Sequence, residues 1–217
     1  YVGKGLGSWL IQESERMALD IIAGLPSTQR ATIRSYTAGT NVRALALLDH
    51  EGYDAIRHFW RMQIVFDGEP PAPVWPDGVR VADAREGVDE RGLYDLTEAA
   101  FSEHFQLVPP LDFEQWVKER KRYGFDPSLW TVVWHGDEMV ACALGRMAGD
   151  ATGWISLLGV RKDWRGKGLG RAALLHNFRC FYDRCAPSVA LGVDSANATG
   201  AIRLYESVGM KTVRNYV

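Results

Sequence analysis

The sequence predicts an α/β fold with a mixed sheet, and two observations carry this prediction. Segments that are apolar throughout or in alternation recur between segments whose apolar residues have helical spacing, as strands and helices do. From residue 78 their order is strand, helix, helix, three strands, a glycine-rich loop, and then helix, strand, helix, strand. Of the 217 residues, 47% are hydrophobic and 24% are charged, which is ordinary for a soluble globular chain.

Charge and cysteine usage exclude several classes of function. The net charge is −2, so no basic excess predicts a nucleic-acid partner, and no apolar run is long enough to predict a membrane partner. The cysteines are Cys142, Cys180 and Cys185, without CxxC pairs or a histidine cluster. We therefore expect no metal site and no disulfide framework, but small buried thiols in the reducing cytoplasm.

A proline-rich stretch divides the chain. "DGEPPAPVWPDG" (Asp67–Gly78) holds four prolines and two glycines, which exclude a helix or a central strand. We interpret residues 68–77 as a linker between a first segment, residues 1–67, and a second unit, residues 78–217.

The second unit begins with a strand and two helices. "VRVADA" (Val79–Ala84) alternates as a half-buried strand does, and a helix carrying Leu93, Leu96, Ala100 and Phe101 follows. "DFEQWVKERKRYG" (Asp112–Gly124) predicts a second helix, with Asp112 as its N-cap.

Three strands and a further helix come next. "LWTVVW" (129–134) and "MVACALGRM" (139–147) predict a hairpin about the turn "HGDE", and "GWISLLGV" (153–160) predicts a buried strand. A helix after the glycine loop has Leu174, Phe178 and Phe181 on one face. The unit ends with a strand at 189–193, a helix at 198–209 capped by Asn197 or Thr199, and an alternating strand from 210.

The loop in "DWRGKGLGRAALL" (163–175) predicts an anion site. Alternating glycines let backbone N–H groups converge, and the positive end of the following helix dipole favours negative charge. Arg165, Lys167 and Arg171 add formal charge, so a diphosphate is the natural ligand. A P-loop is excluded because GxxxxGK[ST] is missing, and the dinucleotide fingerprint is excluded because its last glycine is replaced by Arg171.

The pattern R-x-x-G-x-G, at Arg165, Gly168 and Gly170, resembles the coenzyme A loop of the GCN5-related N-acetyltransferases (GNAT). "NATGAIRLYESVGM" resembles a second motif of that family, with Asn197, Ala201, Leu204, Tyr205 and Gly209 on its positions. The resemblance covers residues 78–217 and implies acetyl-CoA as cosubstrate, held between two strands that splay apart. The residues implied to bind it are Leu158, Gly159, Val160, Arg165, Gly166, Lys167, Gly168, Leu169, Gly170, Arg171 and Asn197.

Acetyl transfer to an amine requires an oxyanion donor, an acid and a base. We expect the Val160 N–H to serve the oxyanion and Tyr205 to protonate the leaving sulfur, although a tyrosine there also suits a core face. For the base, Ser156, Asp194, Glu103, His104 and a water relay stay open. The aromatic side chains of Phe101, Phe105 and Trp116 either shape an acceptor pocket or belong to the core.

The first segment repeats parts of the second. "YVGKGLG" (1–7) matches "WRGKGLG" (164–170) at five of seven positions, and residues 41–59 track residues 197–216. In this alignment Val2 replaces Arg165 and Leu48 replaces Tyr205. We therefore expect tandem copies with an incomplete, degenerate first copy, and a natural protein longer at both ends.

Tandem copies are similar to the two-domain acetyltransferases of the mycothiol synthase branch. That branch is expected to carry an acid on the strand before the loop, where this chain has Trp154, Ile155 and Ser156. We therefore predict acetyl transfer to the amine of a small molecule by the second copy, in a cytoplasmic protein that is monomeric rather than oligomeric. The alternatives are mycothiol synthesis itself and a silent coenzyme A-binding scaffold.

Overall fold

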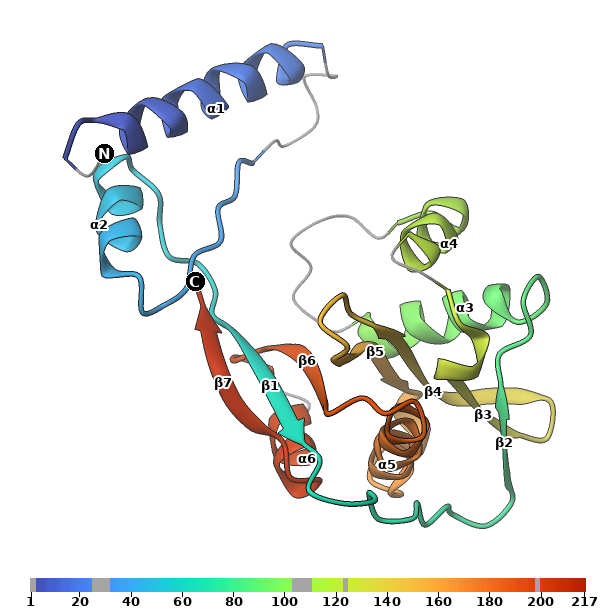
Figure 1. Cartoon of the computed structure of the whole chain (residues 1–217). Coiled ribbons are helices and arrows are strands. Elements are labelled where there is room, and N and C mark those ends of the chain that lie inside the picture. Colours follow the sequence, from blue (N-terminus) through green and yellow to red (C-terminus); the bar gives the residue numbers. More distant parts are fainter. Residues whose placement is uncertain (1–2, 25–31, 103–110, 123–124, 198–199) are drawn as a thin grey trace. The chain divides into compact units, whose positions relative to one another are not determined.

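The computed structural model describes residues 3–24, 32–102, 111–122, 125–197 and 200–217 (Figure 1). Within these residues, seven strands form one sheet in the order β2-β3-β4-β5-β6-β1-β7. The strands are β1 Phe59–Val65, β2 Val79–Asp83, β3 Trp130–His135, β4 Glu138–Met147, β5 Gly153–Val160, β6 Ser188–Asp194 and β7 Lys211–Tyr216. The α-helices are α1 Leu6–Ile22, α2 Val42–His50, α3 Glu90–Phe101, α4 Phe113–Lys121, α5 Leu169–Tyr182 and α6 Ala201–Ser207.

The sheet confirms the predicted mixed α/β class. Strands β2 to β5 are antiparallel in chain order, and the expected β3–β4 hairpin closes about Gly136, whose φ is +56°. β5 and β6 are parallel, with the crossover through α5 between them. β1 takes a place that the sequence did not predict, between β6 and β7. It meets β6 through a hydrogen bond from Phe66 N–H to the Pro187 carbonyl, 3.0 Å long.

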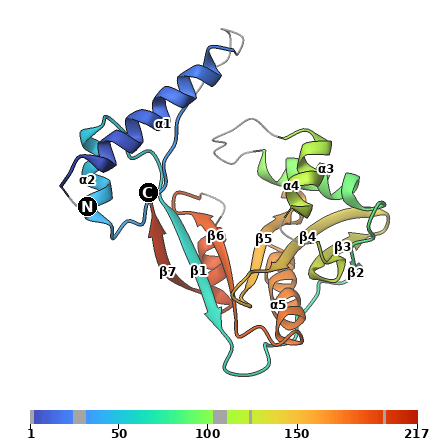
Figure 2. The same ribbon diagram turned by 45° about the horizontal axis from the view of Figure 1, so that its top comes forward.

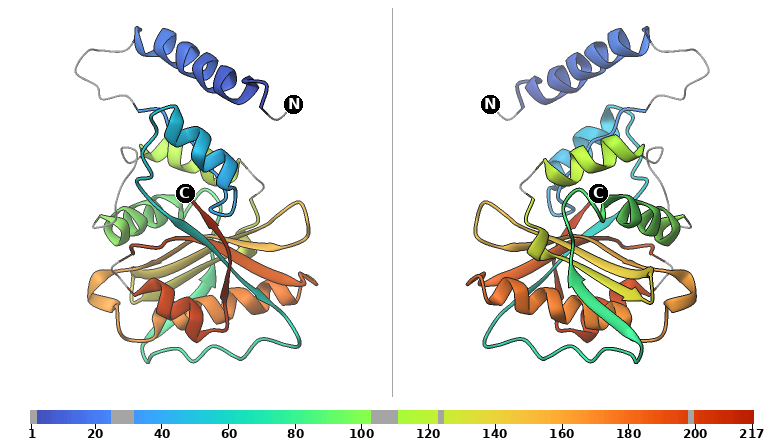
Figure 3. Two further views of the ribbon diagram at one scale, coloured as in Figure 1. Left: turned by 90° about the vertical axis from the view of Figure 1, so that its left-hand side faces the viewer. Right: turned by 90° about the vertical axis from the view of Figure 1, so that its right-hand side faces the viewer.

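The chain divides into two compact units, residues 1–60 with 214–217, and residues 61–213. In the larger unit, α3 and α4 cover one face of the sheet, and α5 covers the other (Figure 2). The α3–α4 side holds a core that includes Leu93, Trp116 and Leu144. On the α5 side, Phe181 lies against the backbone of Gly145 and Gly153, where a Cβ would come within 2.7 Å of its ring. Figure 3 shows α6 along the same face as α5.

The predicted core faces of the two best-packed helices are confirmed. Leu174, Phe178 and Phe181 of α5 are fully buried. Leu93 of α3 is fully buried as well, and Leu96 is almost fully buried. Asp112 caps α4, because its side chain accepts a hydrogen bond from the Gln115 N–H. The predicted end of that helix, Gly124, lies outside the described residues.

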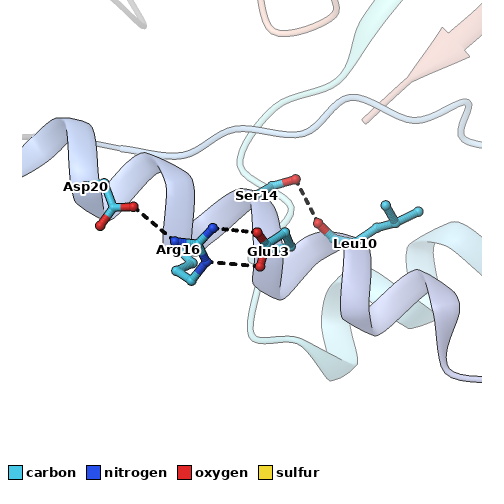
Figure 4. Close-up of polar contacts among 5 residues, drawn as sticks. All are labelled: Leu10, Glu13, Ser14, Arg16 and Asp20. Atoms are coloured by element: carbon cyan, nitrogen blue, oxygen red, sulfur yellow. Dashed lines mark hydrogen bonds and ion pairs between the residues drawn. The ribbon is translucent and has the colours of Figure 1, made fainter.

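The smaller unit contains α1 and α2. No residue of α1 is buried, and its polar side chains satisfy one another along the helix surface (Figure 4). Arg16 pairs with Glu13 at 2.6 Å and with Asp20 at 3.1 Å, and the Ser14 hydroxyl donates to the Leu10 carbonyl. The α1 backbone is therefore supported by local contacts, while Trp9, Leu10 and Met17 stay more than half exposed.

Two sequence expectations are wrong. Helix α6 begins at Ala201, and its N-cap is Gly200, which has φ +79° and provides no side-chain hydrogen bond. Asn197 is therefore not the cap of α6. The alternative cap, Thr199, lies outside the described residues. The left-handed Gly200 turns the chain into the helix instead. The thiols are not uniformly buried either, because Cys185 is exposed in the turn after α5.

Candidate active site

β5 and β6 part within the sheet. Their parallel register runs over only three pairs, from Gly153 with Val189 to Ile155 with Leu191, although β5 has eight residues. Beyond Ile155 the described residues show no pairing between the two strands. The expected splay is therefore present, and it leaves one edge of β5 open from Ser156 to Val160.

A bulge in β5 marks the point where the strands separate. Leu144 of β4 faces Leu157, but the next residue, Gly145, faces Ile155, so Ser156 is the extra residue. A bulge locally bends and twists its strand, which fits the loss of pairing with β6. Ser156 is exposed, and sequence reasoning considered it only as a base, since no local signal marks a bulge here.

The backbone of Val160 and Leu158 points into the opening. The Arg161 N–H donates to the Val140 carbonyl of β4 at 3.0 Å. In an antiparallel ladder such pairs alternate, so Gly159 directs its backbone groups to β4 while Leu158 and Val160 direct theirs away from it. The contact of the Val160 carbonyl with Arg165 Nε, at 3.4 Å, agrees with this direction. Leu158 and Val160 thus present backbone donors and acceptors at the open edge.

The glycine loop has the bare backbone that the sequence predicts. Gly166 and Gly168 have φ of +75° and +86°, and a Cβ at either would meet no described atom within 4 Å. Gly168 is the N-cap of α5, and the N–H of Ala172 returns to its carbonyl. Among the described contacts, none uses the N–H groups of residues 166–171. Six backbone donors therefore stand at the positive end of the α5 dipole.

The three loop cations have different surroundings. The Arg165 guanidinium donates to the Ala100 carbonyl at 2.9 Å and to Val160, which ties the loop to the end of α3. The Lys167 ammonium lies 4.4 Å from the centre of the Trp164 ring. Arg171, in the first turn of α5, is exposed and makes no described ion pair. Arg165 therefore holds the loop in place, and Lys167 and Arg171 supply its exposed charge.

The other two predicted residues come from α6 and the turn before it. Tyr205 is 8% exposed, and burial raises the pKa of its hydroxyl to about 12. Leu204, the residue before it, packs on the loop, where a Cβ at Gly170 would lie 3.0 Å from Leu204 Cδ2. The Asn197 N–H donates to the Asp194 carbonyl at 3.1 Å. Helix α6 therefore packs directly against the glycine loop, and Tyr205 stays protonated at neutral pH.

The candidate bases are only partly described. The Asp194 carboxylate accepts a hydrogen bond from the Ala196 N–H at 2.9 Å, so this side chain caps the turn after β6. Glu103, His104 and Phe105 lie outside the described residues. Trp116 is 3% exposed and packs edge-to-face on Trp130, so it belongs to the core.

Three further features of the described residues concern metal ligands, membrane spans and a groove away from the loop. The described residues include no cluster of three or more metal-ligating side chains. In the described part of the chain, no helix has both the length and the apolarity to span a membrane. A groove of about 400 Å³ lies between the first half of α3 and the β3–β4 hairpin, lined by Asp89, Gly92, Met139 and Arg161 among others. It contains none of the predicted site residues.

Comparison with known proteins shows the family of this chain. Residues 91–210 match the Acetyltransferase (GNAT) family. The chain is 30% identical over 206 residues to the mycothiol acetyltransferase of Saccharopolyspora erythraea, covering 94% of this chain and 67% of that protein. A crystal structure of a GCN5-related N-acetyltransferase from Sphaerobacter thermophilus is 36% identical, with a TM-score of 0.87 over 100% of this chain and 67% of that one.

A third likeness concerns the fold alone. A tandem GNAT protein from the clavulanic acid biosynthesis pathway has 14% identity and a TM-score of 0.69, over 100% of this chain and 70% of that protein. The chain thus spans about two thirds of the length of these three proteins. The matched region contains the glycine loop, the splayed strands and α6. The chain therefore belongs to the GNAT family of acetyltransferases and is an acyltransferase.

Proposed function

We propose that residues 78–217 transfer an acetyl group from acetyl-CoA to the amine of a small molecule. The observation that carries this proposal is the glycine loop, in which the six N–H groups of residues 166–171 donate none of the described hydrogen bonds and lie at the start of α5. Residues with no side chain at positive φ leave room for a diphosphate to approach the backbone. Acetyl-CoA, when bound, supplies the activated acyl group.

The residues have separate roles in this proposal. Backbone N–H groups of Gly166, Lys167, Gly168, Leu169, Gly170 and Arg171 hold the pyrophosphate, and Asn197 borders the site. Leu158 and Val160 hydrogen-bond the pantetheine arm along the open edge of β5, and Gly159 keeps that strand on β4. The Val160 N–H stabilises the negative charge that develops on the carbonyl oxygen.

Tyr205 is proposed to donate a proton to the leaving sulfur. Its burial supports this role in one respect, because a pKa of about 12 keeps the hydroxyl protonated throughout the physiological range. The same shift makes it a weaker acid than an ordinary tyrosine, so bound substrate must lower the pKa again for full proton transfer.

We also propose that residues 1–67 are the end of a degenerate first copy, joined through the linker 68–77 to the active one. The support is local geometry: Gly3 and Gly5 have φ of +77° and +72°, close to Gly166 and Gly168. α1 begins directly after Gly5 just as α5 begins after Gly168. Tyr205 has no counterpart, since Leu48 stands at its place.

Calorimetry of acetyl-CoA binding tests the proposal, with a matched pair of variants. Gly168→Trp puts a large side chain where the diphosphate approaches, and we expect binding to fall by at least about a hundredfold. Gly5→Trp makes the same change in the first copy, at a glycine whose φ is also positive (+72° against +86°), and should leave acetyl-CoA binding unchanged. Equal loss in both variants, or binding that survives Gly168→Trp, would contradict the assignment of the loop.

A second candidate function is mycothiol synthesis, favoured by the name of the Saccharopolyspora relative. It is separated from the general proposal by the acceptor: the cysteinyl amine of the mycothiol precursor should be acetylated in preference to other small amines. Acetyl-CoA binding without turnover on any amine would instead support a silent scaffold.

A further inference from the structure

The side chain of Asn177 lies where α5 packs on the sheet, and it is fully buried. Its Nδ2 is 2.9 Å from Thr131 Oγ1, 3.3 Å from the Leu129 carbonyl oxygen and 3.4 Å from the Ala143 carbonyl oxygen. The opposite orientation of the amide would put Oδ1 against two carbonyl oxygens, so the Nδ2 faces the strands. One side chain of α5 therefore joins the beginning of β3 to the middle of β4.

The carbonyl end of the same amide lies against Gly145 of β4. A Cβ at Gly145 would be 2.8 Å from Asn177 Oδ1, so the amide occupies space that a larger residue at 145 would need. Asn177 thus contacts β4 at Ala143 and at Gly145, on both sides of Leu144. The register of β4 with β5 changes between Leu144 and Gly145. Asn177 therefore supports β4 at the bulge.

Stability alone does not account for an asparagine at this place. Among the described residues, none donates a hydrogen bond to Asn177 Oδ1, which is buried. A buried polar atom that lacks a partner costs free energy, and an apolar side chain of similar size, such as leucine, would avoid that cost. The asparagine is therefore better explained by what its amide holds in place than by the stability that it adds.

The bulge decides which backbone groups of β5 reach the opening. In the register beyond the bulge, Gly159 faces Cys142 and directs its backbone groups to β4. The register on the other side of the bulge, continued along β5, would instead place Leu158 opposite Cys142. Leu158 and Val160 would then turn their backbone groups toward β4, because these directions alternate along a strand. Loss of the bulge would thus remove the Val160 N–H from the opening.

We propose that Asn177 is a positioning residue for acetyl transfer: by holding β4 at Ala143 and Gly145, it keeps the bulge in place and the Val160 N–H at the opening. This inference rests on the proposed function, which assigns that N–H to the developing oxyanion. Asn177 acts through β4, from the face of the sheet that α5 covers (Figure 2). Its effect is on the placement of a donor and not on the reacting atoms.

Amide hydrogen exchange of the free protein, followed by NMR, reads the register of β5 directly. In the wild type we expect the Gly159 N–H to exchange at least about tenfold more slowly than those of Leu158 and Val160. We call this factor the exchange ratio. Asn177→Leu removes the amide and keeps a side chain of similar size, and it should lower the exchange ratio at least about threefold.

Two ligands test the effect on the reacting group. Acetyl-CoA and coenzyme A differ only in the acetyl group, so a larger shift of the Val160 N–H resonance with acetyl-CoA reports contact with the acetyl carbonyl. We expect this difference in the wild type and its loss in Asn177→Leu. Calorimetry should show acetyl-CoA binding weakened less than about threefold, because the glycine loop is unchanged.

Turnover is measured with S-methyl-L-cysteine, an amine without a free thiol, as release of the coenzyme A thiol. In Asn177→Leu, kcat should fall at least about tenfold while the KM for acetyl-CoA changes less than about threefold. A structural role alone would predict the opposite pattern, in which the thermal midpoint falls and kcat is kept.

Two further variants control for packing and for folding. Leu174→Ala changes another fully buried residue of α5 that is not among the atoms nearest to a Cβ at Gly145. It should lower the thermal midpoint but keep both the exchange ratio and kcat. Thr131→Val removes only the closest acceptor of the Asn177 amide, so it should lower the exchange ratio by a smaller factor. Added to Asn177→Leu, it should have no further effect. Thr131→Val also tests the proposal if Asn177→Leu does not fold.

Two outcomes would overturn the proposal. One is an exchange ratio that is kept in both Asn177→Leu and Thr131→Val. The other is a loss of kcat that follows the thermal midpoint equally in Asn177→Leu and Leu174→Ala. Failure of the proposed function looks different, because the wild type would then bind no acetyl-CoA or transfer no acetyl group. The exchange ratio is measured without any ligand and is independent of both.

Discussion

The glycine loops at residues 3–7 and 166–170 have similar backbone conformations but different surroundings. The hydrogen bond from Trp9 N–H to the Gly5 carbonyl and that from Ala172 N–H to Gly168 are both 3.0 Å long. Gly7 lies against Leu47 as Gly170 lies against Leu204. Yet α1 buries no residue while α5 buries eight. Glycine spacing therefore specifies the conformation of the loop, and side chains outside it decide how the following helix is packed.

The C-terminal ends of α2 and α6 show the same similarity of backbone. Tyr53 N–H donates to the Leu48 carbonyl at 2.9 Å, and Met210 N–H donates to the Tyr205 carbonyl at 3.1 Å. Gly52 and Gly209 both have positive φ, +86° and +90°. The chain thus reverses in the same way after a leucine in one place and a tyrosine in the other. The backbone geometry of the two turns is therefore similar although only one of them follows a tyrosine.

The largest expected difference between the two regions is catalytic. Tyr205→Phe removes the proposed acid but keeps the ring, so kcat for acetyl transfer should fall about 10²–10⁴-fold with little change in the KM for acetyl-CoA. Leu48→Phe puts the same ring at the aligned position of the first region and should leave kcat unaffected. Steady-state kinetics of the purified variants decide the matter. An unchanged kcat in Tyr205→Phe would assign that residue to the core instead.

The next difference is in packing. Leu174 is fully buried in α5, and Leu174→Ala should lower the free energy of unfolding by about 2–5 kcal/mol. Ile11 occupies the equivalent position of α1 and is only partly buried, so Ile11→Ala should cost less than about 1 kcal/mol. Urea unfolding monitored by circular dichroism measures both. Similar losses in the two variants would mean that α1 is packed more tightly than the contacts of residues 3–24 indicate.

The conformation of the glycine loop was predictable from sequence because it depends on local backbone chemistry. Glycines at 166 and 168 meet their positive φ without strain, and the apolar run in 129–134 is visible in the sequence as a buried strand. The bulge at Ser156, the place of β1 between β6 and β7, and the contact of Arg165 with Ala100 were not predictable. Each depends on residues far apart in the chain that meet only after the sheet has formed.

The smallest expected difference is in alkaline stability, because Tyr205 can ionise and Leu48 cannot. Burial raises the pKa of Tyr205 to about 12, above its unfolded value of about 10, so its contribution is complete below pH 10 and is lost as the pH rises toward 12. The loss amounts to roughly 2–3 kcal/mol.

The buried Cys142 thiol, with its pKa also raised to about 12, adds a loss that begins near pH 9 in wild type and variant alike. Subtracting the Tyr205→Phe unfolding curve from that of the wild type therefore isolates the tyrosine. If wild type and Tyr205→Phe lose stability in parallel above pH 10, the hydroxyl of Tyr205 is hydrated and not buried.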